Sequence, residues 1–456
     1  MKKILSLILA CLMVASLAAC GSSSAEPAEY TGLQAGYGRA DVSPLAPMGM
    51  DGYGDRDERL SGDILDPTYA TCVAIKQGES TFLLFTVDVL SCQDSIANRL
   101  RDSIKSELGI PQENIIIGAT HTHSAVTWNG GTSTGCIQAA KDAIADLAPA
   151  TMTAATTTLE GMNFVRHYLM NDGTYYGSNF GSTESGFKAH AIDVDPELSM
   201  ISLAREGKKD IWMVNWQAHP ASAARQDSYT GISADFVGYA RKKVELEANV
   251  HFAYYTGAAG NVNPRSHIDG ETPASSKTYQ SYGASLGGLI IEAMKKLQPT
   301  EGNEMMTARN KFVVEVDHSW DHMAAEASRV VAAWKQQGLE AGHKMAREYG
   351  FSSAYHASAI TTRSVYKGEQ TKTLTALRVG NVAFINNDYE MFCDHGQYVK
   401  EKSPFDVTFV ITGCSGYIAN ELAYSYRSYE SDTSPYVSGT GEKLAEEMAR
   451  LLNTMK

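Results

Sequence analysis

The chain has 456 residues, of which 43% are hydrophobic and 20% are charged. This is the composition of an ordinary globular protein, and it excludes a disordered, collagen-like or polytopic membrane protein. Lysine and arginine total 39 against 52 aspartate and glutamate residues, so the formal net charge is −13. A nucleic-acid partner is therefore disfavoured, because binding to a phosphate backbone requires a basic surface.

The first residues are predicted to be a leader rather than part of the fold. Lys2 and Lys3 precede an almost unbroken apolar run over 4–16, and residues 17–20 read Leu-Ala-Ala-Cys. A run this short with these flanks is typical of a secretory signal. The Leu-Ala-Ala-Cys ending resembles that of bacterial lipoproteins, which implies removal of residues 1–19 and lipidation of Cys20. The alternative is an ordinary signal peptide with a chance cysteine.

The stretch that follows Cys20 favours the lipoprotein interpretation. It begins Gly-Ser-Ser-Ser-Ala-Glu-Pro, and such a polar sequence forms a flexible tether, here expected over 20–34. A multi-chain lipid anchor holds a protein stably at a membrane where a single acyl chain does not. We therefore expect an exported protein, anchored through the lipid on Cys20 to the outer face of the bacterial cell membrane.

Five cysteines remain beyond Cys11 and Cys20. Their odd number and the lack of paired spacing predict neither a disulfide framework nor a structural zinc site. We expect single buried thiols, and one disulfide stays open as an alternative. These cysteines are Cys72, Cys92, Cys136, Cys393 and Cys414.

From residue 36 onward, short apolar runs alternate with helical patterns. The expected strands cover 81–89, 114–119, 210–216, 250–255, 373–385 and 407–411. The expected helices cover 94–108, 135–147, 236–248, 276–297, 323–349 and 442–455. This interleaving predicts an α/β fold of layered β-sheets flanked by helices. The turn at Gly380 and Asn381 divides one run into a hairpin, so the sheets are expected to be mixed.

Polar side chains follow five of these expected strands. Ligands of open α/β sheets bind beyond the carboxyl ends of strands, so we expect these side chains to share one cleft and any metal site to lie there. The residues concerned include His121, His123, His219, Asn263, Glu390 and Tyr417.

The His-Thr-His segment is the first candidate for metal binding. Residues two apart in an extended segment point the same way, so His121 and His123 can face one cleft. Burying two imidazoles is costly unless their lone pairs have a partner, and a divalent metal is a good one. The pair alone leaves hydrogen-bonded histidines as the alternative, as does His219. His318 and His322 are expected on a solvated helix face. The remaining histidines are expected to be structural: His167, His190, His251, His267, His343, His356 and His395.

Read in order, several segments resemble the neutral/alkaline (non-lysosomal) ceramidase family, zinc amidases that hydrolyse the N-acyl bond of ceramide. The similar segments are Ala-Gly-Tyr-Gly-Arg-Ala-Asp-Val-Ser-Pro at 35–44, Met-Asp-Gly-Tyr at 50–53, Ala-Thr-His-Thr-His-Ser at 119–124, Asn-Trp-Gln-Ala-His-Pro at 215–220, Ser-Ala-Asp-Phe-Val-Gly-Tyr-Ala at 233–240, Gly-Tyr-Ile at 416–418 and Tyr-Glu at 429–430. They follow the family's order, and the resemblance implies one catalytic domain over 35–456.

The resemblance also implies a metal site and a mechanism. The implied Zn²⁺ ligands are His121, His219, Glu390 and Tyr417. Their nitrogen and oxygen donors suit zinc, which activates water for attack on an amide carbonyl. The implied donors to the resulting oxyanion are His123, Arg166 and Tyr429. His123 would also carry a proton to the leaving amine, and Asp88 and Asp235 are expected to orient the ligating imidazoles.

Two features differ from the family's pattern. Where the family has Gly-Asp-Val-Ser-Pro, residues 260–264 read Gly-Asn-Val-Asn-Pro, so Asn263 replaces a serine. An amide is not a nucleophile, although it donates hydrogen bonds to an oxyanion, so attack by metal-activated water is retained and a seryl mechanism is not. In addition, 27 residues (456 − 429) follow Tyr429, and the family's C-terminal β-sandwich domain is expected to be absent.

The sequence therefore predicts a zinc-dependent amidohydrolase that acts on a small-molecule N-acyl or lipid-like substrate. Both differences leave open whether that substrate is ceramide, and the helical stretch 323–349 is expected to shape the substrate mouth. Two alternatives remain at this stage. One is another metallohydrolase reaction at the same site, such as ester or lactone cleavage, and the other is a non-catalytic ligand-binding lipoprotein.

Overall fold

Two β-sheets stacked face to face form the centre of the computed structural model, which describes residues 32–53, 59–177, 186–265, 278–366 and 368–456. The larger sheet has the order β12-β11-β10-β5-β1-β2-β3-β4, with β14 beside β5. Its strands are β1 (Leu33–Asp41), β2 (Tyr69–Gln77), β3 (Ser80–Val87), β4 (Ile115–Ala119), β5 (Ala148–Thr158), β10 (Glu197–Arg205), β11 (Ile211–Trp216), β12 (His251–Thr256) and β14 (Gln298–Pro299).

The smaller sheet packs on one face of the larger one. Its order is β15-β16-β17-β19, and its strands are β15 (Met305–Val314), β16 (Gln370–Val379), β17 (Val382–Asn387) and β19 (Val407–Thr412). Apolar side chains of both sheets meet between them, among them Leu84, Ile116, Phe384 and Phe409, all fully buried. Because strand side chains alternate between faces, each sheet also has an outer apolar face that helices must cover.

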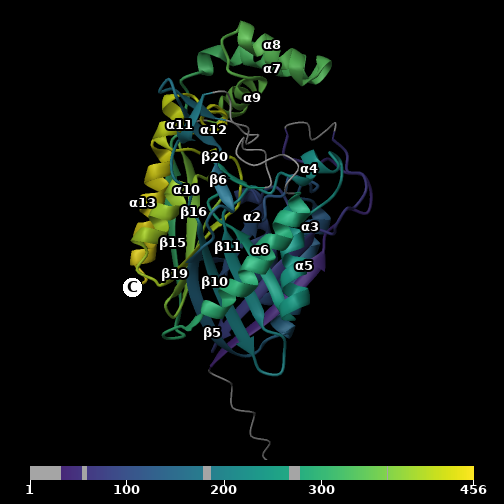
Figure 1. Ribbon diagram of the computed structural model, residues 1–456, viewed down its shortest axis with the longest axis vertical. Helices are drawn as coiled ribbons and strands as arrows, with labels where there is room; N and C mark the ends of the chain where they lie inside the picture. The colour runs from purple at the N-terminus through teal and green to yellow at the C-terminus, as the bar shows by residue number, and fades with distance from the viewer. Residues whose placement is uncertain (1–31, 54–58, 178–185, 266–277, 367) are drawn as a thin grey trace, which may run out of the picture. The chain divides into compact units, whose positions relative to one another are not determined.

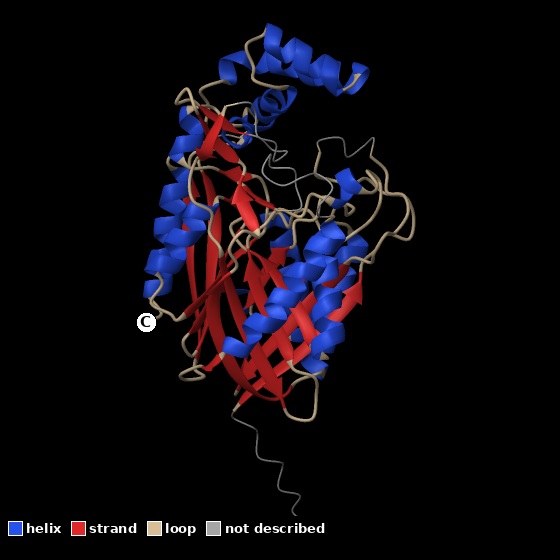
Figure 2. Cartoon of the chain, viewed as in Figure 1, coloured by secondary structure: helices blue, strands red, loops and turns tan. Residues whose placement is uncertain are grey.

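Helices cover both outer faces, which gives four layers (Figure 2). α2 (Asp94–Leu108) and α3 (Gly130–Ala145) share an apolar core with β2, β3 and β4. α5 (Asp235–Ala248) and α6 (Tyr279–Ala293) pack on β10, β11 and β12. α10 (Cys393–Lys402) and α13 (Thr440–Asn453) cover the smaller sheet, as Figure 1 shows.

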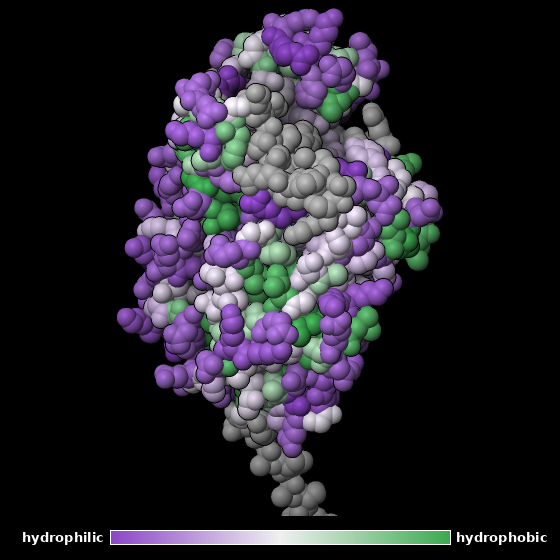
Figure 3. Space-filling model, viewed as in Figure 1, coloured by the Kyte–Doolittle hydropathy of each residue, from purple (hydrophilic) through white to green (hydrophobic). Residues whose placement is uncertain are grey.

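Three further helices form a bundle with its own small core. α7 (Ala324–Gln337), α8 (Leu339–Glu348) and α9 (Ala354–Arg363) pack around Val330, Phe351 and Ile360. The single helix expected over 323–349 is therefore two, because Gly338 between them has a φ of +90°, which suits glycine and ends a helix. The side of α7 and α8 visible in Figure 3 is mainly hydrophilic, as expected if their apolar side chains face the bundle core.

Short elements connect these layers. The short strands are β6 (Asn163–Val165), β7 (His167–Met170), β8 (Tyr175–Gly177), β9 (Phe187–His190), β13 (Val262–Pro264), β18 (Glu390–Met391) and β20 (Tyr417–Ile418). The short helices are α4 (Ala223–Gln226), α11 (Glu421–Ser425), α12 (Tyr429–Thr433) and the 3-10 turns η1 (Gln112–Asn114), η2 (Met294–Lys296) and η3 (Asp321–Met323).

The predicted fold class is confirmed. β3 and β4, β11 and β12, and β17 and β19 pair in parallel, whereas the other pairs of the two large sheets are antiparallel, so the sheets are mixed. The hairpin at Gly380 joins β16 to β17. Among the longer strands, β1, β2, β5, β10 and β15 were not predicted. β1 contains two glycines, and β5 is rich in threonines that are partly or fully exposed, so neither strand forms an apolar run.

Several other expectations concern the described residues directly. The five cysteines beyond Cys20 are buried free thiols, as predicted. No helix among the described residues combines the length and apolarity needed to cross a membrane. The compact unit runs from Gly32 to Lys456. The expected leader, Cys20 and most of the tether fall in residues 1–31, outside the described part of the chain.

The two edge strands of the larger sheet, β4 and β12, meet at their carboxyl ends. The Thr256 hydroxyl donates to the carbonyl oxygen of Thr120 at 2.9 Å, although these strands stand at opposite ends of the strand order. The Thr412 hydroxyl, at the end of β19, donates to the Thr256 carbonyl oxygen at 3.2 Å. The polar segments that follow β4, β11, β12 and β19 are thereby brought to one place.

Candidate metal centre

Two histidines face each other beyond the ends of β4 and β11. The Nε2 atoms of His121 and His219 are 2.9 Å apart, and both side chains are buried. His121 Nδ1 donates to the Leu90 carbonyl oxygen at 2.7 Å, and His219 Nδ1 donates to that of Ala259 at 3.0 Å. A carbonyl oxygen only accepts hydrogen bonds, so each Nδ1 carries the proton. In the neutral rings, both Nε2 lone pairs therefore point at the same space.

A carboxylate completes this arrangement. Glu390 Oε2 lies 3.2 Å from Nε2 of His121 and 3.7 Å from Nε2 of His219. It accepts no hydrogen bond from any other described residue. Glu390 pairs in register with Tyr417 through the parallel strands β18 and β20, so the carboxylate and the phenol belong to neighbouring strands. Four candidate ligands from four segments of the chain thus lie together.

His123 also lies in the cluster. Its ring centroid is 4.9 Å from that of His121 and 5.1 Å from that of His219. Among the described residues, neither ring nitrogen of His123 has a hydrogen-bond partner, although the side chain is buried. One nitrogen from each of the three histidines lies within 4.8 Å of the others. The His-Thr-His spacing had made His123 a candidate for metal binding, whereas the family resemblance gave it a proton-transfer role.

The backbone around these histidines is held in unusual conformations. His121 has a φ of +68°, a region that a non-glycine residue occupies at an energetic cost. Gly52 has a φ of +122°, and a Cβ atom there would lie 2.7 Å from Nδ1 of His123. A side chain at position 52 would therefore displace His123. The backbone N–H of His123 donates to the carbonyl oxygen of Pro220, the residue after His219.

Burial and neighbouring charges set the protonation states. Burial holds the pKa of His219 and of His123 well below its usual value, and the charge of His121 acts in the same direction. Burial also opposes the charged form of His121, but the carboxylate of Glu390 outweighs it and raises that pKa well above the usual value. Without a metal, a proton on His121 therefore offsets the charge of Glu390. A bound cation would take its place.

The orienting partners of the histidines differ from those expected. Asp88 binds Arg241 and the backbone N–H of Tyr69, and Asp235 accepts from the N–H groups of Ser222 and Ala223. Neither carboxylate contacts an imidazole, because carbonyl oxygens already receive the Nδ1 protons. The expectation for Asp88 and Asp235 was therefore wrong. Asp235 instead stabilises the backbone that follows His219.

Arg166 connects the remaining predicted residues. Its Nη2 donates to the hydroxyl of Tyr417 at 3.1 Å and to the carbonyl oxygen of Gly260 at 2.7 Å. Its Nη1 donates to Oδ1 of Asn263 at 3.3 Å. Asn263 is buried, and its Nδ2 has no hydrogen-bond partner in the described part of the chain. An unpaired buried amide donor is costly, so this N–H group is available to an acceptor on a ligand.

Sequence reasoning missed a buried carboxylate that holds Arg166. Glu430 Oε1 accepts from Nε of Arg166 at 2.9 Å, and its Oε2 lies 2.9 Å from Nε2 of His167. Burial opposes the charged form of Glu430, but His167 and Arg166 outweigh it and lower its pKa to about 2. The sequence signal that could have identified Glu430 is its position directly after Tyr429 in the Tyr-Glu motif. His167, expected to be structural, fixes this carboxylate and also binds Tyr426.

Tyr429 stands at the start of α12 beside the centre. Its ring centroid is 5.8 Å from that of Tyr417. Burial and the charge of Glu390 raise the pKa of Tyr429, so its hydroxyl stays protonated and able to donate. All eight residues predicted for the site, four as ligands and four as catalytic groups, therefore lie around one centre.

A cleft of about 540 Å³ opens onto this centre. Its inner wall includes His123, His219 and Asn263, and its outer wall includes Leu339 and His343 of α8 together with residues that precede and begin α9. The prediction that the helical stretch shapes the mouth is supported by this lining. The wall residues also include Tyr53, Arg225 and Tyr355, which sequence reasoning did not select.

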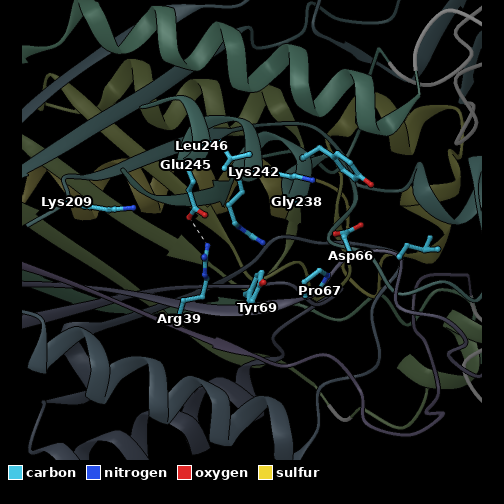
Figure 4. A pocket seen from close by; sticks show the side chains of 12 residues that line it. Arg39, Asp66, Pro67, Tyr69, Lys209, Gly238, Lys242, Glu245 and Leu246 are labelled. Atoms are coloured by element: carbon cyan, nitrogen blue, oxygen red, sulfur yellow. Dashed lines mark hydrogen bonds and ion pairs between the residues drawn. The ribbon is translucent and has the colours of Figure 1, made fainter. Parts of the chain in front are cut away.

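A second hollow, of about 570 Å³, lies on another part of the molecule (Figure 4). Two of its arginines are paired with carboxylates. Arg39 contacts Glu245 at 2.7 Å, the dashed line in Figure 4, and Arg241 binds Asp88. It contains none of the predicted site residues. The histidine centre and its cleft are therefore the candidate active site.

Two solved structures share this fold. A neutral ceramidase from Pseudomonas aeruginosa aligns with a TM-score of 0.70 at 14% sequence identity, over 94% of this chain and 75% of that chain. A structure described as a ceramidase complexed with C2 aligns with a TM-score of 0.68 at 15% identity, over 93% of this chain and 75% of that chain. At these identities the likeness establishes the fold.

The sequence itself identifies the family. Residues 33–336 match the family model described as neutral/alkaline non-lysosomal ceramidase, N-terminal. The chain belongs to the neutral/alkaline non-lysosomal ceramidase family, as the ordered motifs implied. It is accordingly a hydrolase that acts on amide bonds.

Proposed function

We propose that this hydrolase is zinc-dependent and cleaves the N-acyl bond of a small-molecule or lipid-like substrate with an activated water. The observation that carries the proposal is the convergence of Nε2 of His121, Nε2 of His219 and Oε2 of Glu390 within 3.7 Å of each other. Three electron-pair donors at this separation repel each other unless a cation or a proton lies between them.

The donor set fits zinc. Two imidazoles and one carboxylate are common ligands of catalytic Zn²⁺ sites, and they leave a position for water or substrate. We propose that His121, His219 and Glu390 hold the ion, with the Tyr417 phenol as a weak fourth ligand. Zinc supplies Lewis-acid polarisation and lowers the pKa of water from about 15.7 to about 7.

The surrounding side chains supply hydrogen bonds and proton transfer. Arg166, fixed by Glu430, stands beside the hydroxyl of Tyr417, and the free Nδ2 of Asn263 supplies a second donor. We propose that these groups and the hydroxyl of Tyr429 stabilise the oxyanion that forms from the amide carbonyl. His123, neutral because of its burial, accepts a proton at a ring nitrogen and passes it to the leaving amine.

A substrate panel tests this function. Purified protein would be assayed for fatty-acid release from C12 ceramide and other N-lauroyl amides, and for cleavage of matched lauroyl esters and a lactone. The proposal predicts amide turnover that is abolished by chelation and restored by Zn²⁺. Turnover that is confined to the ester or lactone, or that is indifferent to chelation, would contradict it.

We further propose that the protein is exported and held at the outer face of the bacterial cell membrane by a lipid on Cys20. The support is the Leu-Ala-Ala-Cys ending of the apolar leader and the polar stretch that follows it. An anchor at the membrane surface would place the cleft near amphipathic substrates, but it does not by itself define them as lipids.

A further inference from the structure

Tyr355 of α9 connects the helical bundle to the candidate active site. α9 lies beside α12, the short helix that begins at Tyr429 (Figure 1). The ring of Tyr355 meets that of Tyr429 edge to face, with centroids 5.7 Å apart and planes at 90°. The ring of Tyr429 in turn meets that of Tyr417 at 5.8 Å and 74°. A row of three rings therefore runs from the bundle to the proposed ligand Tyr417.

The hydroxyl of Tyr355 makes a second connection. It donates to the carbonyl oxygen of Tyr53 at 3.3 Å, across 302 positions of the chain. The ring of Tyr53 lies 5.2 Å from that of His123, and the Tyr53 hydroxyl donates to the carbonyl oxygen of Ala221 at 3.2 Å. The residue that packs against His123 is thus held at its backbone by Tyr355 and at its side chain by the segment that follows His219.

The other two bundle helices hold Tyr355 in place. Trp334 of α7 and His343 of α8 each meet its ring edge to face, with centroids 5.2 Å and 5.4 Å away. Aromatic pairs of this kind have a preferred geometry, so the contacts with these rings and with Tyr429 restrict the orientation of Tyr355. Nδ1 of His343 accepts from the backbone N–H of Ala354 at 3.2 Å, which fixes that ring to the start of α9. Each helix of the bundle therefore contributes one ring to the same cluster.

α9 also contacts α12 away from Tyr355. Nδ1 of His356 lies 3.8 Å from Oδ2 of Asp432. Nη1 of Arg363 donates to the carbonyl oxygen of Ser434 at 3.3 Å, directly after α12 ends. Because these contacts hold the two helices together, we expect a substitution of Tyr355 to change the local ring packing without detaching the bundle.

We infer that Tyr355 is a positioning residue, through which the bundle orients the Tyr429 hydroxyl and supports His123. The inference rests on the proposed function, in which these two groups stabilise the oxyanion and transfer a proton. A hydrogen-bond donor stabilises a transition state only when it is already aimed at the developing charge, and a displacement of about 1 Å costs up to about 100-fold in rate. The bundle thus contributes to the rate as well as to the wall of the cleft.

Two substitutions separate the contacts of Tyr355. Tyr355→Leu removes the ring beside Tyr429 and should lower kcat by about 30-fold with a smaller change in KM. Tyr355→Phe keeps the ring and loses only the hydrogen bond to Tyr53, so kcat should stay within about threefold of wild type. The measurement is laurate release from the N-lauroyl amide of the panel that the wild type cleaves fastest. Zinc content should equal that of wild type in both variants, because Tyr355 is not a proposed ligand.

A double-mutant cycle identifies the group through which the ring acts. Tyr429→Phe removes the hydroxyl that the ring is inferred to orient. In that background Tyr355→Leu and Tyr355→Phe should have the same kcat/KM within about twofold, although they differ by about tenfold when the hydroxyl is present. The matched control is Tyr349→Leu, the same change at a residue that packs on the core of the same bundle and is not among the described residues that line the cleft. It should leave kcat unchanged.

Three results would overturn the inference while the proposed function stands. They are wild-type kcat in Tyr355→Leu, loss of zinc from Tyr355→Leu, and an equal difference between the two Tyr355 variants with and without the Tyr429 hydroxyl. If the zinc-loaded wild type cleaves no amide of the panel, both the inference and the proposed function are overturned.

Discussion

The Nε2 atoms of His121 and His219 face each other at 2.9 Å, and each ring is locked in that orientation by a backbone carbonyl oxygen. With Glu390 beside them, the arrangement is stable only when a positive charge occupies the space between the three groups. His121 follows β4, one edge strand of the larger sheet, and His219 follows β11, the neighbour of the opposite edge strand β12, so the fold itself creates this site.

Loss of one imidazole is expected to abolish metal retention. His121→Ala and His219→Ala each remove a ligand and should lower zinc content from about one ion per chain to a small fraction of that, because only one strong imidazole ligand, Glu390 and the weak Tyr417 phenol would remain. Elemental analysis of purified protein measures this. The control is His322→Ala, whose side chain is exposed and distant in sequence from the centre. Full zinc content in His121→Ala would exclude His121 as a ligand.

Metal removal should also lower stability. Zinc that binds the folded chain only stabilises it by about 2.7 kcal/mol at a free concentration of 100 Kd. Chelation is therefore expected to lower the Tm of the wild type, and added Zn²⁺ should restore it. Differential scanning calorimetry of wild type and His219→Ala provides the measurement. A variant that responds to chelation as strongly as the wild type would argue against a metal at this centre.

Acidification should release the metal. Bound histidines must be neutral, so protons compete with zinc as the pH falls. In the metal-free protein, Glu390 and the thiol of Cys414 hold the pKa of His121 well above its usual value. Protons therefore already compete with zinc for His121 near neutral pH. Zinc affinity measured by competition with a chromophoric chelator should fall steadily from pH 8 to 6. An affinity independent of pH over that range would contradict the ligand set.

Asn263 discriminates between two mechanisms. Asn263→Ala removes the buried Nδ2 donor and is expected to lower kcat by about 100-fold, as loss of one oxyanion-hole donor does. Asn263→Ser restores a hydroxyl and should lower kcat less, with turnover remaining at or below that of wild type. Steady-state kinetics on the best amide substrate measures both. Turnover by Asn263→Ser far above that of wild type would instead favour a seryl nucleophile.

Glu430 is expected to stabilise the fold as well as to hold Arg166. Glu430→Gln leaves the buried guanidinium without its carboxylate and should lower the free energy of unfolding by about 3 kcal/mol at neutral pH. The folded-state pKa of about 2 lies below the ordinary value of 4.5, so this stabilisation is complete above pH 4.5 and is lost as the pH falls towards 2. Urea denaturation from pH 7 to 3 measures it, with the exposed Glu421→Gln as control. Equal stability of Glu430→Gln and wild type at pH 7 would contradict this account.

The anchoring proposal has its own test. Cys20→Ser removes the thiol that is proposed to carry the lipid and should shift the protein from the membrane fraction of cells to the soluble or unprocessed fraction. Metabolic labelling with a fatty acid should label the wild type and not the variant. Labelling that persists in Cys20→Ser would reject the lipid anchor at that position.

Much of the architecture was readable from the sequence because it depends on local patterns. The bounds of α2 agree with the expected helix, and β4, β11, β12 and β19 agree with their expected strands within a residue or two. Burial on both faces makes these strands continuous apolar runs. β5 was not predicted because it is half exposed. The break at Gly338 was not predicted because an apolar helical pattern continues on both sides of it.

The eight residues predicted for the site came from family motifs, whereas the groups that hold them in place were not predicted. Glu430, His167 and the carbonyl oxygens of Leu90 and Ala259 act through contacts between segments far apart in the chain. Every residue has a backbone carbonyl oxygen, so a sequence does not indicate which of them accept the histidine protons. The acidic residues proposed to orient the histidines, Asp88 and Asp235, bind other groups. Arg225 and Tyr53 were recognised as wall residues only when the fold placed them on one cleft.

The central claim is that His121, His219 and Glu390 bind one zinc ion. Anomalous diffraction from crystals of zinc-loaded protein, collected on both sides of the zinc absorption edge, tests it most directly. The account predicts a single strong peak within about 2.0–2.2 Å of the two Nε2 atoms and a Glu390 carboxylate oxygen. A peak located elsewhere, or the lack of any peak at this position in protein that is active on amides, would contradict it.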